Sequence, residues 1–299
     1  MSLRLSAVVP ATNAPPTLER CLRAISAADA PPEEVVVVRE STLAGPAEAR
    51  NLGAQRARGD VLVFVDADVV VHADAFRRIR AALEADQGLT AIFGSYDDSP
   101  PAPGAVSGFR NLLHHYVHQS APGPATTFWA GLGAIRRDAF LASGGFDAAR
   151  YPRASIEDVE LGVRMAETGA RIVLDPELQG THLKSWSLGE MVRTDFARRG
   201  VPWAELLLEG RGSLTALNLG RRHRASALAA VGLAGALVAR RPRAAAVALA
   251  ALVALNGSFY ALLARRRGTA EAAAGVGLHA VHHLVSAAAA AAALVRRRP

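Results

Sequence analysis

Short apolar runs alternate with helix-patterned segments in the first part of the chain. Apolar runs cover residues 5–9 and 61–65, and a third run, EVVVV, covers 34–38. The two segments between them place apolar residues at helical spacing; one begins near Thr17 and the other covers 46–59. Continuous apolar runs are typical of strands that are buried on both faces of a parallel sheet. The order therefore predicts an α/β fold in which crossover helices join parallel strands.

A different pattern begins at residue 221. From there the chain holds twelve arginines and one acidic residue, Glu271, which is a net charge of +11; because the whole chain carries +7, residues 1–220 carry 7 − 11 = −4. The arginines form four clusters around three apolar intervals, at 225–239, 244–264 and 272–295. A membrane-spanning helix needs about 20 apolar residues, which the second and third intervals supply. A soluble Ala-rich helical bundle is the alternative.

This division predicts two domains, an α/β domain at 1–215 and a membrane-associated tail at 216–299. We expect the last two intervals to cross the membrane as a hairpin, with the first interval at the interface. The arginine clusters at 240 and 296 then share one side, which the positive-inside rule makes cytoplasmic. The expected location is the cell membrane, with the first domain in the cytoplasm. The start of the chain predicts no cleaved signal peptide.

The basic charge does not indicate a nucleic-acid partner, because it is confined to the tail rather than spread over the chain. A single cysteine, Cys21, excludes an internal disulfide and fits a reducing compartment.

Two carboxylates, Asp66 and Asp68, directly follow the apolar run at 61–65, and Glu40 follows the run at 34–38. In parallel sheets, ligands collect at the carboxyl ends of the strands. Residues i and i+2 of an extended segment point the same way, so the two aspartates can present oxygens to one divalent cation. The alternative is that they only cap the next turn.

Five motifs in this order resemble those of an inverting, family 2 glycosyltransferase with the GT-A fold. They are VVPATN, VVVVRES, GPAEARNLGAQRARGDVLVFVDADV, GLGAIRRDAFLASGGFD and IEDVELGVRM, and the resemblance covers residues 5–200. It implies a mixed, mostly parallel sheet flanked by helices, which the hydrophobic helices predicted for the tail would follow. It also implies transfer of a sugar from a nucleotide-diphosphate donor to an acceptor hydroxyl or phosphate. The membrane-associated tail favours an acceptor that is a membrane lipid.

The resemblance also assigns residues to the nucleotide. The backbone at Pro10 and Ala11 would line the nucleoside pocket, and Glu40 would contact the base or ribose. Arg50 and Asn51 would lie along the nucleotide. The turn ESTLAG at 40–45 departs from the family pattern, which leaves the base preference open.

The metal and the chemistry are assigned in the same way. Asp66 would face the ribose and the metal, Asp68 would bind the metal, and His182 would complete the metal shell or else be a packing residue. Manganese or magnesium suits these ligands. Asp158 would be the general base that deprotonates the acceptor. Helix capping is the simpler explanation for Asp158 and its neighbour Glu157.

The acceptor or diphosphate side would include Gly131, Gly133, Glu157, Lys184 and Trp186. The glycines would let the backbone approach the sugar, and the following pair Arg136–Arg137 would meet phosphate; a tight strand with exposed arginines is the alternative. For Trp186 the alternative is a core or membrane-interface anchor.

Two other functions compete with glycosyl transfer. A sugar-1-phosphate nucleotidyltransferase has a similar sheet, but VVPATNAPPTL lacks the glycines of its phosphate-binding loop. The second is a non-catalytic membrane protein whose degenerate transferase domain only binds nucleotide.

Overall fold

A computed structural model describes residues 2–41 and 45–297 and divides the chain into two compact units. The first unit contains residues up to 97 together with 118–183, and the second contains 98–117 together with everything from 184. The unusual turn ESTLAG falls partly on residues 42–44, which lie outside the described residues.

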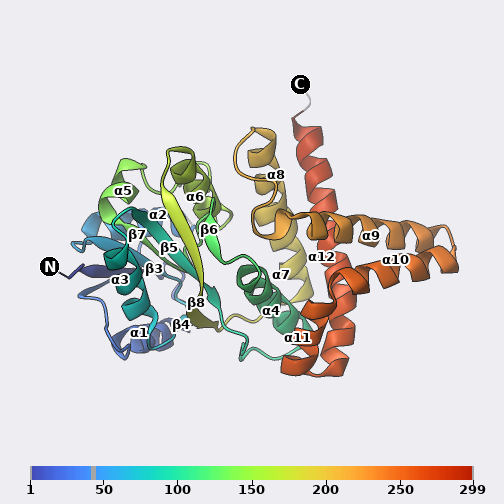
Figure 1. Ribbon diagram of the computed structural model, residues 1–299, viewed down its shortest axis with the longest axis horizontal. Coiled ribbons are helices and arrows are strands. Elements are labelled where there is room, and N and C mark those ends of the chain that lie inside the picture. Colours follow the sequence, from blue (N-terminus) through green and yellow to red (C-terminus); the bar gives the residue numbers. More distant parts are fainter. Residues whose placement is uncertain (1, 42–44, 298–299) are drawn as a thin grey trace. The chain divides into compact units, whose positions relative to one another are not determined.

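The first unit is built on an eight-stranded mixed sheet (Figure 1). Its order is β2-β1-β3-β7-β5-β8-β4, and β6 pairs with β8. Strands β1, β2, β3, β5 and β8 run in one direction, and β4, β6 and β7 run in the other. The predicted mixed, mostly parallel sheet is therefore confirmed. The strands are β1 (Leu5–Pro10), β2 (Glu34–Val38), β3 (Val61–Val65), β4 (Val69–Val71), β5 (Leu89–Tyr96), β6 (Gly123–Ala125), β7 (Leu132–Arg136) and β8 (Arg171–His182).

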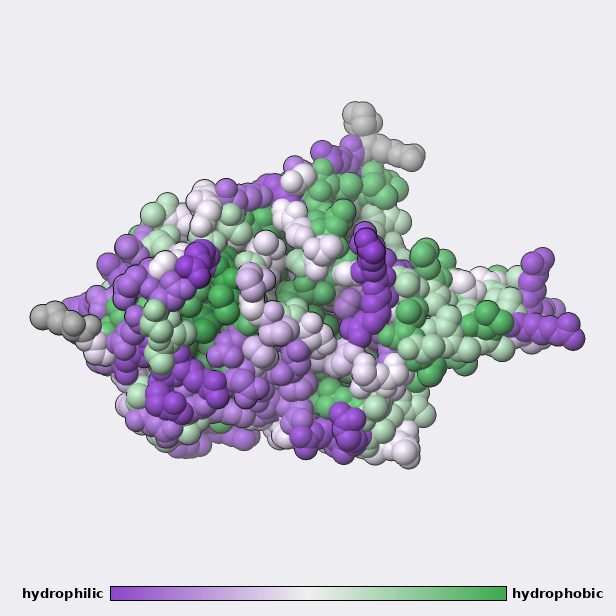
Figure 2. All heavy atoms as spheres, in the orientation of Figure 1, coloured by the Kyte–Doolittle hydropathy of each residue, from purple (hydrophilic) through white to green (hydrophobic). Residues whose placement is uncertain are grey.

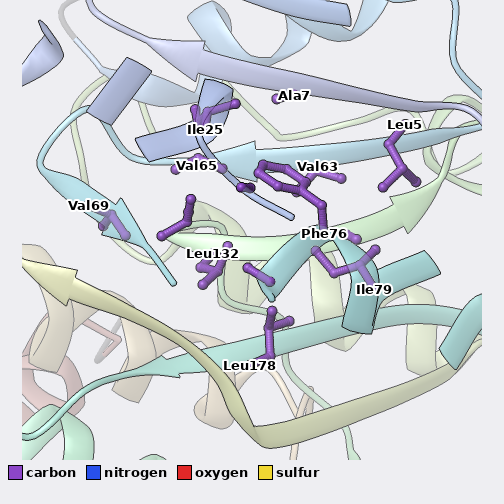
Figure 3. Packing of buried hydrophobic residues seen from close by; sticks show 14 of the residues in the cluster. Leu5, Ala7, Ile25, Val63, Val65, Val69, Phe76, Ile79, Leu132 and Leu178 are labelled. Atoms are coloured by element: carbon purple, nitrogen blue, oxygen red, sulfur yellow. The ribbon is translucent and has the colours of Figure 1, made fainter. Parts of the chain in front are cut away.

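Helices cover both faces of this sheet. They are α1 (Leu18–Ser26), α2 (Pro46–Arg56), α3 (Ala75–Ala85), α5 (Arg137–Ala142) and α6 (Glu157–Glu167). Because side chains alternate along a strand, Val63 and Val65 pack with α1 and α3 on one face, while Phe64 meets Phe140 and Phe146 on the other. Figure 3 shows the first face, where Phe76 and Ile79 of α3 lie among the strand side chains.

Two local expectations are wrong. The run at 34–38 forms β2 as predicted, but β2 is the edge of the sheet and Val35 is 39% exposed, so this strand is not buried on both faces. Helix α2 ends at Arg56, three residues before Gly59. The chain is extended at Ala57, and the Gly59 amide donates to the Ser6 hydroxyl at 2.8 Å, which directs the chain into β3.

The second unit is helical. It contains α4 (Ala105–Gln119) up to residue 117 and the consecutive segments α7 (Leu188–Arg193), η1 (Thr194–Gly200, a π-helix) and α8 (Val201–Leu208). After η2 (Leu217–Leu219) come α9 (Arg221–Val238), α10 (Pro242–Leu255), α11 (Gly257–Arg267) and α12 (Thr269–Arg296). Phe109, Leu112, Phe259 and Leu263 belong to its apolar core.

The apolar interval at 244–264 is not one straight helix, contrary to expectation. Helices α10 and α11 meet at Asn256 with a bend of 74°. The side-chain amide of Asn256 donates to the Leu252 carbonyl and to the Ser226 hydroxyl, each at 2.9 Å. Gly257 follows, and the ladder of backbone hydrogen bonds along the helix is interrupted at this point. Among the described residues, only α12 is by itself long and apolar enough to cross a membrane, and the bent pair would make a second span.

Candidate functional site

The site begins where β3 ends. Asp66 follows Val65 directly, as predicted, and its amide donates to the Gly131 carbonyl at 3.0 Å. Its own carbonyl accepts from the Val69 amide at 2.9 Å, which closes the turn into β4. The Cys21 thiol lies 3.5 Å from the same carbonyl; burial, with smaller effects of Asp66 and Asp68, raises its pKa to about 12. Cys21 is thus a buried core residue under the turn.

Arg50 holds two carboxylates together at this strand end. Its guanidinium donates to Asp66 Oδ1 at 2.7 Å and to Glu157 Oε1 at 2.9 Å. Arg50 and Glu157 are buried, with side chains 4% exposed. Burial by itself lowers the pKa of Arg50, but Asp66, Glu157 and Asp158 outweigh it and the net shift is upward. The Arg50 guanidinium, which is permanently charged, therefore joins helix α2 to the end of β3 and to the start of α6.

Asp158 lies beside this cluster in the first turn of α6. Its carboxylate accepts from the amides of Ala130 at 3.1 Å and Val159 at 2.8 Å. Burial and the charge of Glu157 raise its pKa to about 6. One turn later, a Cβ at Gly162 would come within 2.1 Å of the Phe128 nitrogen, so only glycine lets α6 approach the segment that holds Asp158. A carboxylate with this pKa can exchange a proton near neutral pH.

Asp68 and His182 form a second pair. Asp68 lies three residues after the end of β3, and His182 is the last residue of β8. The Asp68 Oδ2 and His182 Nε2 atoms are 3.4 Å apart. The Leu183 amide donates to the Asp68 carbonyl at 2.9 Å, which joins the two backbones. His182 is buried and stacks on Tyr96, with centroids 4.1 Å apart and planes 5° apart. The strand β8, which His182 ends, is twelve residues long.

The residues that the resemblance assigns to the nucleotide differ in their exposure to solvent and in their hydrogen bonds. Ala11 is buried, and its amide donates to the Val38 carbonyl at 2.8 Å, while Pro10 is partly exposed and Glu40 is exposed. Asn51 exchanges two hydrogen bonds with the backbone of Phe146, at 2.8 and 2.9 Å. It thereby ties α2 to the segment before α6, and its contact with a nucleotide stays a prediction.

Packing explains the two glycines near β7. A Cβ at Gly131 would meet the Trp129 ring at 2.3 Å, and one at Gly133 would meet the Trp129 carbonyl at 2.4 Å. Both positions are buried, so neither backbone is open to a sugar in this structure. Their assignment to the acceptor side stays a prediction.

Arg136 and Arg137 donate to backbone carbonyls, and their contact with phosphate stays a prediction. Arg136 donates to the Leu89 and Leu83 carbonyls at 2.8 and 2.7 Å, and Arg137 donates to the Ala57 carbonyl at 3.0 Å. Both guanidinium groups are therefore joined to the backbone around β7.

Lys184 and Trp186 belong to the second unit. The Lys184 ammonium lies 4.1 Å from the centroid of the Trp186 ring, and the Trp186 indole donates to Asn111 Oδ1 at 3.3 Å. Trp186 is thus packed against α4, and the role of both residues at a diphosphate stays a prediction.

Two features of the site were not predicted. One is the ion pair between Arg50 and Glu157, which are 107 residues apart in the chain. The other is Tyr96, the last residue of β5, which supports His182 and also meets Trp129 edge-on at 4.8 Å. An aromatic residue at the end of a buried strand was the available signal for Tyr96.

Comparisons with known proteins indicate the family to which part of the chain is similar and the fold of the chain. Residues 35–142 match the family model of glycosyl transferase family 2, a segment that includes Arg50, Asp66 and Asp68. A search of curated protein sequences gives no significant match. Among solved structures, a mannosyltransferase from Pyrobaculum calidifontis, solved with GDP-Man and Mn²⁺, is similar with a TM-score of 0.56 at 19% identity, covering 100% of this chain and 89% of its own.

Two further solved structures are less similar, and each has a TM-score of 0.47. GalNAc-T7, with UDP, GalNAc and Mn²⁺, is 17% identical over 62% of this chain and 44% of its own. TarS residues 1–349 from S. aureus is 14% identical over 96% and 91%.

The mannosyltransferase shows which fold the chain has, and the family match shows which sequences the segment 35–142 is similar to. The fold is GT-A, as the sequence motifs predict. Residues 35–142 are similar to glycosyl transferase family 2, and the protein is a glycosyltransferase.

Proposed function

We propose that the protein transfers a sugar from a nucleotide-diphosphate donor to an acceptor hydroxyl or phosphate, with inversion at the anomeric carbon and with Mn²⁺ or Mg²⁺. The observation that carries this proposal is the group of carboxylates at the end of β3, in which Arg50 joins Asp66 to Glu157 and Asp158 stands beside them. The similar mannosyltransferase was solved with a sugar nucleotide and Mn²⁺, which favours the same donor type.

Asp158 is the proposed general base. Its two backbone hydrogen bonds fix the carboxylate, and its raised pKa makes it a stronger proton acceptor than an exposed aspartate. It would take the proton of the acceptor hydroxyl as that oxygen attacks the anomeric carbon. A single displacement of this kind inverts the configuration.

The metal would be held by Asp68 and His182. A carboxylate and an imidazole 3.4 Å apart, with the Asp68 side chain 31% exposed, suit Mn²⁺ or Mg²⁺ together with phosphate oxygens. Asp66 gives one oxygen to Arg50, so we assign it mainly to the ribose. When bound, the metal would join these ligands to the diphosphate and stabilise the leaving group. Within the described part of the chain, no group of three or more His, Cys, Asp or Glu side chains is arranged for a metal.

Metal-dependent nucleotide binding tests the donor site. The full chain in detergent should bind UDP, GDP or dTDP by calorimetry more tightly with Mn²⁺ than without it, and Asp68→Ala should remove that difference. Asp29→Ala, on an exposed loop position of the same unit, is the matched control and should bind as the parent does. If no nucleotide binds under any condition, the proposed donor site is wrong.

The transfer rate should fall at low pH. Because the proton acceptor must be ionised and the pKa of Asp158 is raised to about 6, kcat/KM should decrease about tenfold for each pH unit below that value. Above it, this group should no longer limit the rate. The measurement is kcat/KM from pH 4.5 to 8 at saturating metal. An acid limb that lies near pH 4 would argue against Asp158 as the base.

We infer that the acceptor is carried on a membrane lipid and that the first unit faces the cytoplasm. The support for this is the Arg-punctuated apolar tail, which would confine enzyme and acceptor to one plane. Incorporation of labelled sugar into an extractable lipid tests it, and a label found only in water-soluble products would contradict it.

A further inference from the structure

The hairpin of α9 and α10 has an unusual surface. Between residues 226 and 238 and between 244 and 255, it contains no charged side chain, and its polar residues are limited to Ser226 and glycines. Large apolar side chains on it are nevertheless exposed, including Leu228 at 74%, Val238 at 86% and Val247 at 70%. Figure 2 shows this hydrophobic surface over the hairpin and hydrophilic residues at its outer end.

The exposed apolar residues are not confined to one face. In the apolar part of α10, residues 244–255, the exposed positions are Ala244, Ala246, Val247, Leu249, Ala250, Ala251, Val253 and Ala254. A helix that docks into a protein groove presents an apolar stripe and keeps a polar face for water. This helix has no polar face, so the partner must surround the hairpin, as the hydrocarbon of a lipid bilayer does.

Charge marks the limits of this surface. Arg221, Arg222 and Arg224 lie at the base of the hairpin, and Arg240, Arg241 and Arg243 lie at its tip. Arginine side chains can extend along a helix axis and place their charge among headgroups. At 1.5 Å per residue, the apolar part of each helix is about 20 Å long. The hydrocarbon layer of a bilayer is about 30 Å thick, and the extended arginine side chains can span the difference in length.

Helix α12 is longer than α9 and α10, and another segment of the chain packs along it. The segment formed by α7, η1 and α8 (residues 188–208) packs along it so closely that a Cβ at Gly200 would lie 2.6 Å from the Ala289 Cβ. At the middle of α12, His282 Nδ1 is 2.7 Å from Asp195, which also pairs with Arg110 at 2.7 Å.

Arg193 and Arg198 of the same segment are exposed. If α12 crossed a bilayer, these exposed arginines would lie beside its midpoint, in hydrocarbon, where an exposed charge is strongly disfavoured.

We propose that the α9–α10 hairpin is the part of the chain that enters the lipid bilayer, while α12 and residues 188–208 remain outside the hydrocarbon. The Asn256 amide, bonded to Ser226, fixes the base of the hairpin. In Figure 1 the hairpin projects from the long axis of α12, as an inserted element must if α12 is to stay outside. The inference does not rest on the proposed transfer reaction.

Cysteine labelling of the full chain in vesicles of phosphatidylcholine and phosphatidylglycerol tests the proposal. Cys21 is replaced by alanine, and single cysteines are placed at Val247 and Leu228 in the hairpin, at Ala197 in η1 and at Ala290 on an exposed position of α12. With a membrane-impermeant maleimide, Val247→Cys and Leu228→Cys should label at least tenfold more slowly in vesicles than in detergent. Ala197→Cys and Ala290→Cys should label at similar rates in both.

Equal labelling of the hairpin cysteines in vesicles and detergent would overturn the proposal, and so would protection of Ala197→Cys and Ala290→Cys by lipid. Flotation with vesicles gives a second measurement. Val247→Asp should reduce the bound fraction several-fold, and Val35→Asp, which places the same charge on the exposed edge strand β2, should not. Unchanged flotation of Val247→Asp would also count against the hairpin.

Discussion

Replacing Asp158 with asparagine should lower kcat by about 10²- to 10⁴-fold, the usual contribution of a general base. Asparagine keeps the size of the side chain and one oxygen that can accept from the Ala130 or Val159 amide, but it cannot take a proton from the acceptor. Nucleotide binding with Mn²⁺ should persist, because Asp68 and His182 are unchanged. The measurements are steady-state transfer, or donor hydrolysis where the acceptor is not identified, and calorimetry on the same preparation.

The matched control is Asp147→Asn, at an exposed position in the loop before α6, which should leave both quantities unchanged. Full activity of Asp158→Asn would show that the proton acceptor lies elsewhere. Loss of nucleotide binding together with activity would mean that Asp158 supports the donor site rather than the chemistry. Nucleotide binding in a parent protein without any turnover would favour a degenerate, non-catalytic domain.

Replacing Arg50 with methionine should lower the free energy of unfolding by about 3 kcal/mol, because it leaves the buried Glu157 and the partly buried Asp66 without their cation. The loss should be smaller at pH 5 than at pH 8. Without Arg50 the pKa of Asp66, which burial already raises, rises further, so the folded state binds a proton more readily than the unfolded state and is favoured as the pH falls. Chemical denaturation at the two pH values measures this difference.

Arg56→Met provides the control, since Arg56 lies on the same helix but is exposed, and its replacement should change stability by less than about 0.5 kcal/mol. The double variant Arg50→Met/Glu157→Gln should be more stable than Arg50→Met alone, because it removes one of the unpaired charges. If Arg50→Met unfolds at the same denaturant concentration as the parent, the ion pairs do not contribute to stability as described.

Local signals predicted the first part of the fold well. The apolar runs at 34–38 and 61–65 became β2 and β3 with the expected bounds, and α2 begins at Pro46, where proline suits the first turn. The position of β2 at the sheet edge was not predictable, because periodicity describes a strand and not its neighbours. The position of β7 was not predictable either. It lies antiparallel between β3 and β5, although it begins 67 residues after the end of β3 (132 − 65).

In the candidate site, too, some features were recognisable from the sequence and others were not. Asp66 and Asp68 were recognisable because carboxylates that end a buried strand need a compensating partner. The identity of that partner required tertiary structure, since Arg50 reaches Glu157 only after α2 and α6 have packed on the sheet. The bend at Asn256 was missed because one polar residue in a long apolar interval hardly alters its mean hydropathy, although its side chain breaks the helix.

Lys184 is the only lysine in the chain, and it follows the residue whose amide is bonded to the Asp68 carbonyl. An amine-reactive reagent therefore has a single lysine side chain as its target. Its ammonium lies on the face of the Trp186 ring, so a reagent must lift it from that ring to react. The extent of acylation of Lys184, measured by mass spectrometry on a single peptide, would then report on the environment at the end of β8. This measurement needs no engineered label and no altered residue.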